Sequence, residues 1–299
     1  MSRRGVLLLL SLGIIWGIPY LLIKVAVTEV SPAMLVLART AIASLLLVPL
    51  AAARGQLRPA LRRWRPLLAF TIIEIVIPWY FLNRAEQHLP SSTTGLLIAA
   101  VPLVGFAIAF LTGRAERFVT SNWLGVALGM AGVATLVGFD LRVTDVTALL
   151  QLAVVIVCYA VGPQILSRWM HDLPGAGVSA LSFAGAAIVY LPVVLVAGAW
   201  PTAMPSPAAL GAMLVLGVVC SALAFLVFVA LIAEVGPVRS TVVTYINPAV
   251  AVAAGALVLG ESVTAWTVLG FVLVLAGSFL VTRRGMTTVI SEPVSSPRS

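Results

Sequence analysis

Residues 102–132 read PLVGFAIAFLTGRAERFVTSNWLGVALGMAG, and residues 248–277 read PAVAVAAGALVLGESVTAWTVLGFVLVLAG. A shift of 146 residues, shortened by one in the polar segment, aligns the two stretches. The matches that matter are a proline, a loop glutamate and an Ala-Gly pair: Pro102 with Pro248, Glu116 with Glu261, and Ala131-Gly132 with Ala276-Gly277. Shared alanines and valines mean little in an apolar chain, whereas these matches fall into one register. The chain therefore contains an internal duplication, which constrains the fold more strongly than any local pattern.

The composition indicates a membrane protein. Of the 299 residues, 61% are hydrophobic and 9% are charged, and the mean hydropathy is +1.13. Soluble domains carry about 25% charged residues, so this chain cannot cover a soluble surface. Lipid permits only helices and closed barrels to span it, and apolar runs of about 20 residues without strand-like alternation select helices. We predict an all-α polytopic membrane protein.

Several other functional classes lack their signatures. The net charge of +8 comes from basic residues in loops between apolar spans, which indicates membrane orientation rather than nucleic-acid binding. Cys158 and Cys220 lie inside apolar spans, so neither a disulfide nor a metal site is expected. His88 and His171 have no intramembrane Ser or Cys partner, and there is no Gly-Lys-Ser phosphate loop. We therefore expect no enzyme activity, no cofactor and no ATP-driven step within this chain.

Hydropathy predicts ten transmembrane helices, over 6–27, 32–52, 66–85, 92–112, 121–139, 147–168, 177–198, 208–233, 238–259 and 265–283. With the N-terminus in the cytoplasm, 14 of the 18 basic residues fall on the cytoplasmic side and three fall outside. This bias predicts that both termini are cytoplasmic.

Because each half holds five spans, the second half must enter the membrane upside down. The expected architecture is two inverted five-helix repeats, residues 1–139 and 147–284, followed by a disordered cytoplasmic tail at 285–299. In secondary transporters built this way, the substrate binds near the bilayer midplane between the halves.

At this point the chain resembles the drug/metabolite transporter superfamily, in particular EamA-type transporters with two EamA domains. The resemblance covers residues 6–284 and rests on these features: Ala85-Glu86-Gln87, Pro90, Pro102, Gly260-Glu261, the Trp-Gly pairs 123/125 and 266/270, and the two Ala-Gly pairs. It implies a secondary transporter of the cell inner membrane that exports small metabolites such as amino acids or xenobiotics. A facilitative channel or a non-transporting membrane scaffold remains the alternative.

Two ionisable residues lie deep in the predicted spans, Arg39 in the second and Glu74 in the third. A charge at the centre of a span costs at least about 2.5–3.5 kcal/mol, so each needs a partner or an aqueous cavity. Their backbones should differ in depth by about 8 Å, which the arginine side chain can cover. One interpretation is a structural ion pair. The other is a pair of cavity charges that meet substrate, with Glu74 as a proton-coupling site.

Prolines mark the predicted hinges. Pro19 with Gly17 in the first span, and Pro163 with Gly162 in the sixth, remove backbone donors, and broken helices in transporters tend to face a cavity. Polar and aromatic residues in the spans complete the predicted substrate-binding set: Trp16, Tyr20, Arg39, Glu74, Tyr80, Asn83, Tyr159, Thr244, Tyr245 and Asn247. Packing of the ninth span and an interfacial aromatic belt in the third are the alternatives.

The expected partners are a small-molecule substrate and the lipid bilayer, without nucleic acid. Gly125 and Gly129, four residues apart, permit close helix approach, either within the chain or in a homodimer. We favour intramolecular packing.

Overall fold

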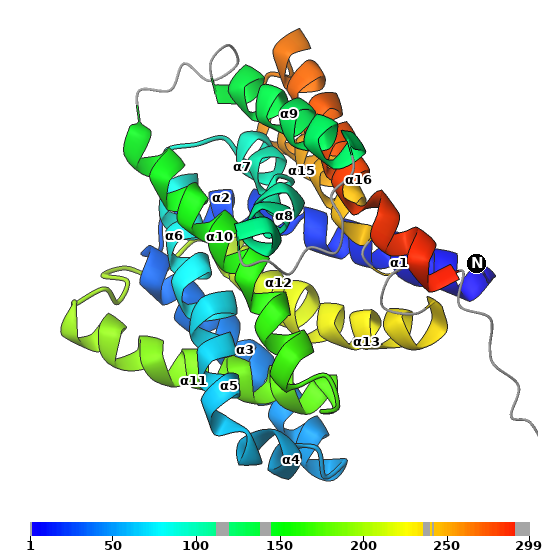
Figure 1. The fold of residues 1–299 in the computed structure, drawn as a ribbon. Coiled ribbons are helices and arrows are strands. Elements are labelled where there is room, and N and C mark those ends of the chain that lie inside the picture. Colours follow the sequence, from blue (N-terminus) through cyan, green and yellow to red (C-terminus); the bar gives the residue numbers. More distant parts are fainter. Residues whose placement is uncertain (1, 112–119, 138–144, 236–239, 241, 291–299) are drawn as a thin grey trace, which may run out of the picture.

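A computed structural model of the chain describes residues 2–111, 120–137, 145–235, 240 and 242–290, and every regular element among them is helical (Figure 1). The first half contains α1 (Arg3–Gly17), α2 (Pro19–Ala26), α3 (Pro32–Ala53), α4 (Leu57–Arg62), α5 (Trp64–Thr71), a π-helical segment (Ile72–Val76), α6 (Ile77–Glu86), α7 (Ser91–Ile98), α8 (Val101–Leu111) and α9 (Thr120–Thr135). The second half contains α10 (Val146–Trp169), α11 (Gly175–Val196), α12 (Pro207–Gly217), a π-helical segment (Val218–Leu223), α13 (Ala224–Val235), α15 (Val243–Leu259) and α16 (Ala265–Ile290).

Among the described residues, seven helical spans are long and apolar enough to cross a membrane: Arg3–Ala26, Pro32–Ala53, Trp64–Glu86, Ser91–Leu111, Val146–Trp169, Gly175–Val196 and Pro207–Val235. Two shorter apolar helices follow, Val243–Leu259 and Ala265–Val281. The prediction of an all-α membrane protein is confirmed. The count of ten spans stays a prediction, because the described residues contain seven helical spans of sufficient length and two shorter apolar helices.

Local chemistry sets where the spans begin. Ser31 and Ser206 each precede a proline and accept a hydrogen bond at 3.2 Å from the backbone N–H three residues on. Asp145 caps α10 in the same way, at 3.1 Å from the N–H of Ala148. Such caps satisfy donors that the first helical turn leaves free, and proline at the first position loses no bond.

The predicted breaks are found in only one of the two places. Pro19 begins α2 after an interruption at Ile18, whereas α10 runs through Pro163 without a break. Two π-helical segments interrupt other spans, and their starts at Ile72 and Val218 are 146 residues apart, the same shift that relates the duplicated stretches. Local sequence does not signal these segments. They mark corresponding positions in the two halves.

Two boundaries differ from those predicted. A short helix, α4, occupies the polar stretch between the second and third spans, where a loop was expected. Helix α16 continues to Ile290, so residues 285–290, assigned above to the disordered tail, are helical, and residues 291–299 lie outside the described part.

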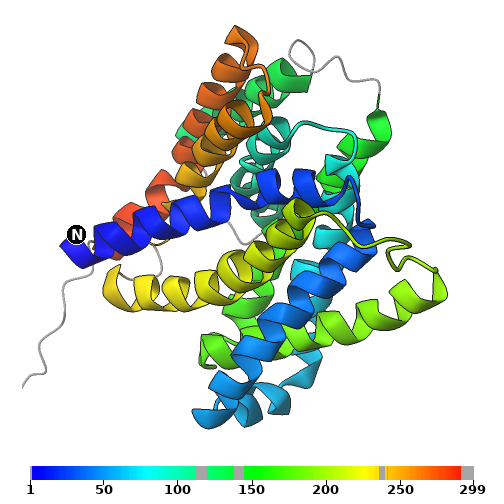
Figure 2. The same cartoon turned by 180° about the vertical axis from the view of Figure 1, so that it is seen from behind.

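Helices of the first half lie against their counterparts in the second. Helix α3 packs along α11, α7 along α15 and α9 along α16, and both views show α9 and α16 side by side (Figures 1 and 2). Glycines permit the last contact: a Cβ added to Gly277 would lie 2.5 Å from the carbonyl oxygen of Gly125 and 2.5 Å from the amide nitrogen of Gly129. The predicted glycine motif thus serves packing within the chain.

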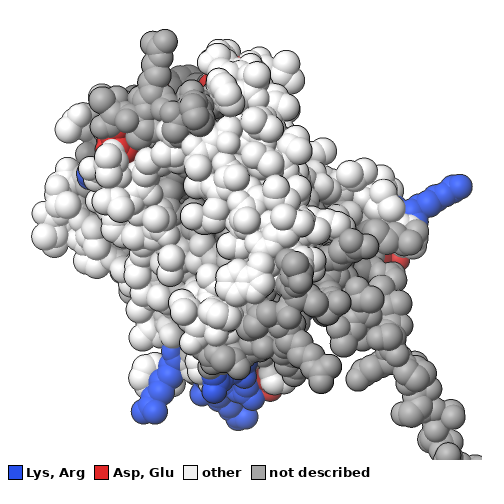
Figure 3. Space-filling model, turned by 45° about the horizontal axis from the view of Figure 1, so that its top comes forward, with Lys and Arg blue, Asp and Glu red and all other residues white. Residues whose placement is uncertain are grey.

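The surface has the charge distribution of a membrane-embedded protein. A broad region carries no charged side chain, and lysines and arginines gather near its lower and right-hand margins (Figure 3). Large apolar side chains are exposed on the helices, among them Leu45 at 74%, Val196 at 88% and Leu257 at 85% exposure. In water such a surface would aggregate, whereas lipid covers it without penalty.

A carboxylate from the second half caps a helix of the first. Glu261 accepts hydrogen bonds from the backbone N–H groups of Ser91 at 2.7 Å and Ser92 at 2.9 Å, at the start of α7. Burial favours its neutral form, but the hydrogen bonds from Ser92 and Ser91 together outweigh burial and lower the pKa of Glu261. The loop before α16 is thereby tied to α7.

We expect Glu261→Gln to destabilise the protein by about 1 kcal/mol at neutral pH, because a neutral amide replaces a charged cap. A lowered folded-state pKa contributes stability above the unfolded-state value of about 4.3 and loses it as pH falls through the folded-state value. The difference in melting temperature between wild type and variant, measured in detergent, should therefore be constant above about pH 5 and shrink below about pH 4. A difference that persists unchanged at acidic pH would contradict the charged cap.

Candidate substrate site

Arg39 of α3 is a buried cation, with 7% of its surface exposed. We refer to Arg39 and the side chains around it as the centre of the protein. Its Nε donates a hydrogen bond of 2.8 Å to the hydroxyl of Ser221, and its guanidinium carbon lies 3.7 Å from the ring centroid of Trp79. The terminal nitrogens of this guanidinium make no hydrogen bond to described residues. A stacked, anchored guanidinium with unused donors is suited to bind a carboxylate or another anion.

The π-helical segment of the second half positions Ser221. Its hydroxyl donates at 2.8 Å to the carbonyl of Leu216, five residues earlier, so it satisfies a carbonyl where the helix widens. The same oxygen accepts from Arg39. One side chain therefore holds both the irregular backbone and the buried cation.

Glu74 lies in the π-helical segment of the first half and faces α10. Its Oε2 is buried and has no hydrogen-bond partner among the described residues. A Cβ added to Gly162 would overlap this carboxylate, so the absence of a side chain at Gly162 makes room for Glu74. Gly162, which was predicted as a hinge residue, thus provides the space into which the Glu74 carboxylate packs.

The hypothesis of an Arg39–Glu74 ion pair is not supported. The ion pairs within 4.0 Å among the described residues join Arg4 with Glu234, Arg63 with Asp172, and His88 with Asp145. Arg39 points to Trp79 and Ser221, and Glu74 points to Gly162. The two central charges are separate.

Two predicted tyrosines lie near this centre. Tyr20 of α2 is 8% exposed and packs against Gly95 of α7. Tyr159 of α10 packs against the same buried cluster as Tyr20. The two tyrosines thus come together from the first and sixth spans, and Glu74 borders Gly162 on the helix that carries Tyr159.

An arc of aromatic rings connects Trp16 with this centre. Trp16 contacts Phe228 at 5.1 Å between ring centroids, Phe228 contacts Phe225 at 6.3 Å, Phe225 contacts Phe183 at 5.8 Å, and Phe183 contacts Trp79 at 5.8 Å. The arc runs through α1, α13, α11 and α6, so both halves contribute to it. Trp16 is therefore linked to Trp79 through three phenylalanine rings.

The other predicted residues make contacts elsewhere. Asn83 donates at 3.2 Å to the carbonyl of Pro32, and Tyr80 stacks on Tyr190, which joins α6 to α3 and α11. Tyr245 donates to the carbonyl of Ser278 on α16 at 3.3 Å, and the side chain of Thr244 is exposed.

Asn247 and Gly17 lie in the contact between α1 and α15. With its amide oriented to satisfy both groups, Asn247 donates to the carbonyls of Val243 and Gly13. A Cβ added to Gly17 would overlap Val250. These contacts favour the packing interpretation of the ninth span.

Trp79 and Ser221 beside Arg39, and the buried Glu86 at the end of α6, were absent from the predicted set. The repeat register could have suggested Ser221, since a shift of 146 from the segment around Glu74 leads to Cys220 and Ser221. Glu86 is fully buried, and neither carboxylate oxygen has a hydrogen-bond partner among the described residues. The third span, predicted to end at residue 85, does not include it.

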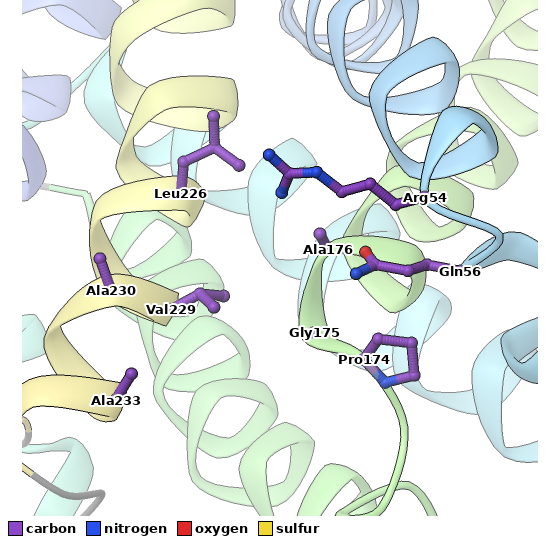
Figure 4. A pocket seen from close by; sticks show the side chains of 9 residues that line it. All are labelled: Arg54, Gln56, Pro174, Gly175, Ala176, Leu226, Val229, Ala230 and Ala233. Atoms are coloured by element: carbon purple, nitrogen blue, oxygen red, sulfur yellow. The ribbon is translucent and has the colours of Figure 1, made fainter.

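A separate pocket of about 420 Å³ opens between the end of α3, the start of α11 and α13 (Figure 4). Arg54 points across it toward α13, and its remaining lining is largely apolar: Gln56, Pro174, Gly175, Ala176, Leu226, Val229, Ala230 and Ala233. None of the central residues Arg39, Glu74 or Tyr159 lines this pocket.

Comparison with known families decides the affiliation. The model of the EamA-like transporter family matches the chain twice, over residues 3–138 and 146–283. The chain belongs to the EamA-like transporter family. As a family member with several membrane-spanning helices, it is a multi-pass membrane protein.

Individual relatives agree with this affiliation. YedA of Escherichia coli K12, described as an uncharacterized inner membrane transporter, is 31% identical over 301 residues that cover 96% of each chain. A probable terminal-alkyne amino-acid exporter of Streptantibioticus cattleyicolor is 27% identical over 274 residues, 90% of each chain. A solved structure titled only "Crystal structure of protein" shares the fold, with a TM-score of 0.68, 21% identity, and coverage of 95% of this chain and 100% of that one.

We expect Gly162→Ala to destabilise this EamA protein by about 1–3 kcal/mol, because the new methyl group must displace the Glu74 carboxylate. Thermal unfolding in detergent measures the effect. Gly211→Ala is the matched control, since nothing lies within 4 Å of a Cβ there. Adding Glu74→Ala to Gly162→Ala should recover most of the loss. A Gly162→Ala protein as stable as the control would contradict the Glu74 contact.

Proposed function

We propose that the protein is a secondary transporter that exports small metabolites bearing a carboxylate, with amino acids as the leading class. The observation that carries this proposal is the arrangement of two unpaired central charges. Arg39 is stacked on Trp79 with unused donors, and Glu74 is turned away from it toward Gly162. An α-amino acid carries one anionic and one cationic group, so it could neutralise both charges at once.

Family membership and one relative support the same class. EamA-like proteins are transporters, and the relative from Streptantibioticus cattleyicolor carries the description of a probable amino-acid exporter. Cargo rich in phosphate would require several cationic side chains, and Arg39 is the cation that the second and third spans bring to the centre.

The architecture in this proposal is ten helices in two inverted five-helix repeats with both termini in the cytoplasm. Three features support it: the two matches to the family model, the pairing of α3 with α11, α7 with α15 and α9 with α16, and the 146-residue spacing of the π-helical segments. Arg114, Arg117 and Arg239, which contribute to the predicted orientation, lie outside the described residues.

Transport then proceeds by alternating access. The substrate binds between the halves, and the site opens to one side of the membrane at a time. Gly17 and Pro19 supply a hinge where α1 gives way to α2. Their counterparts Gly162 and Pro163 lie within the continuous α10, which in this proposal bends there when the site switches sides.

The purified protein in liposomes should show saturable counterflow of amino acids. Replacing Arg39 with Lys, which keeps the charge and loses the flat stacked fork, should weaken apparent substrate affinity about tenfold or more. Arg39→Met should abolish counterflow. Arg65→Met, at an exposed position beside Trp64, is the control and should transport normally. Counterflow that persists in Arg39→Met would refute the carboxylate site, and non-saturable flux or none in the wild type would favour the channel or scaffold alternative.

We further propose that Glu74 couples export to inward proton flow by binding a proton in one state and releasing it in the other. Glu74→Gln keeps the shape of the side chain and removes its titration. An imposed pH gradient should therefore no longer stimulate transport, whereas some downhill exchange remains. Asp172→Asn, which removes a half-exposed carboxylate paired with Arg63, should retain the full response. A folded Glu74→Gln protein with an undiminished pH response would rule out the coupling role.

A further inference from the structure

Lys24 links two spans at one face of the molecule. It lies in the last turn of α2, five residues after Pro19. Its Nζ donates hydrogen bonds to the carbonyls of Glu86 at 2.7 Å and Leu89 at 2.9 Å, at the end of α6 and in the turn that follows. A cation at a helix C-terminus satisfies carbonyls that have no helical partner, and charge-assisted bonds of this kind are strong. We call the face that contains this contact the Lys24 face.

In the second half, Arg168 occupies the position that corresponds to Lys24, and the proposed inverted repeat places it at the opposite ends of the spans. Arg168 lies in the last turn of α10, five residues after Pro163, as Lys24 follows Pro19. Helix α13 ends with Ala233 and Glu234 in its last turn, as α6 ends with Ala85 and Glu86. The spacing and the helix ends thus match between the halves. We call the face that contains Arg168 the Arg168 face.

The two faces nevertheless differ in their contacts. Arg168 is exposed, and its guanidinium carbon lies 5.1 Å from the ring centroid of Trp169; within the described residues it makes no hydrogen bond or ion pair. Glu86 is fully buried, whereas the Glu234 side chain is 24% exposed and accepts a hydrogen bond from Ser2 at 2.5 Å. The contact is therefore formed on the Lys24 face and absent on the Arg168 face.

Packing shows the same difference. On the Lys24 face, Asn83 of α6 binds the carbonyl of Pro32 at the start of α3. The corresponding place on the Arg168 face lies between α13 and the start of α11, where Val229 and Gly175 line the pocket of about 420 Å³ (Figure 4). The end of α6 is thus held by α2 and α3. The end of α13 is held by Ser2 and Arg4 at the start of α1, and toward α11 it borders an opening.

We propose that Lys24 and Arg168 are a matched pair of gating residues. Each binds carbonyl groups at the end of the second span after its own: Lys24 at the end of α6, and Arg168 at the end of α13. In the described state Lys24 holds its face closed. In the opposite state Arg168 binds the α13 end, including the carbonyl of Glu234, and Lys24 releases Glu86. The assignment rests on the alternating access proposed above, because inverted repeats exchange conformations when the site switches sides. Loss of a contact made in only one state shifts the population toward the other.

Thiol labelling can measure this population directly. The background lacks Cys158 and Cys220, the two native cysteines, and carries one reporter: Ala85→Cys on the Lys24 face or Ala233→Cys on the Arg168 face. In nanodiscs, a membrane-impermeant maleimide reaches both faces. Ala85 is fully buried and Ala233 is exposed, so the unmodified protein should label slowly at the first and rapidly at the second.

Lys24→Met should speed labelling at Ala85→Cys by about tenfold and slow labelling at Ala233→Cys, because it removes charge-assisted hydrogen bonds made only in the described state. Arg168→Met should slow labelling at Ala85→Cys further, and the double variant should return toward the wild-type ratio. Arg84→Met, an exposed basic neighbour on the Lys24 face, is the matched control and should change neither rate. If Lys24→Met does not give monodisperse protein, Lys24→Gln carries the same expectation.

Unchanged rates in the Lys24 variants would overturn the gate, as would faster labelling at both faces, which indicates general loosening. Labelling needs no substrate, so it separates this inference from the transport proposal. Reciprocal labelling without amino-acid counterflow would retain the gate and reject the proposed cargo. Counterflow with unshifted labelling would reject the gate alone.

Discussion

A helix in lipid must satisfy its own backbone hydrogen bonds, and the centre of this protein is organised around two places where helices depart from that rule. The π-helical segments at Ile72–Val76 and Val218–Leu223 widen two spans, and a hydroxyl group satisfies a backbone carbonyl within the first and just before the second. Ser221 donates to Leu216, and Tyr190 donates to Val76 at 2.6 Å. Because Ser221 also accepts from Arg39, the irregular backbone and the buried cation depend on the same side chain.

The separation of the central charges follows from helix geometry. Trp79 stacks on Arg39, and it lies five residues after Glu74 on the same span. Glu74 lies in the π-helical segment and Trp79 in α6, so the change of helix type between them alters the direction in which each side chain faces. A span that presents Trp79 to α3 therefore directs Glu74 to another neighbour, which is α10 at Gly162. An ion pair would have neutralised both charges and left nothing for a ligand, whereas separation leaves two groups to be compensated.

Sequence reasoning succeeded where a pattern repeats along the chain and failed where neighbours decide. The duplication and the apolar runs predicted an all-helical membrane protein, and the membership in the EamA-like family agrees. Depth along the spans predicted that the Arg39 side chain could reach Glu74, but depth says nothing about the direction a side chain faces. The unknown direction of the side chains also explains the outcome for Asn83 and Asn247. Their polar groups indicated a cavity, but in the structure they join helices. Proline at position 163 predicts a break, yet a continuous α10 accommodates it.

The two halves contribute unequally to the centre, and this bears on how such a scaffold handles one substrate. Pro49 in α3 and Pro192 in α11 each lie late in corresponding helices, and aligning them places Arg39 opposite Ser182. The π-helical segments place Glu74 opposite Cys220. The cation and the carboxylate both come from the first half, and the second half supplies Ser221 and Tyr159. In the proposed alternating access, a substrate bound through its charges would stay with the first half. The strong ionic contacts would then persist through the switch, and only weaker neutral contacts to the second half would break and reform.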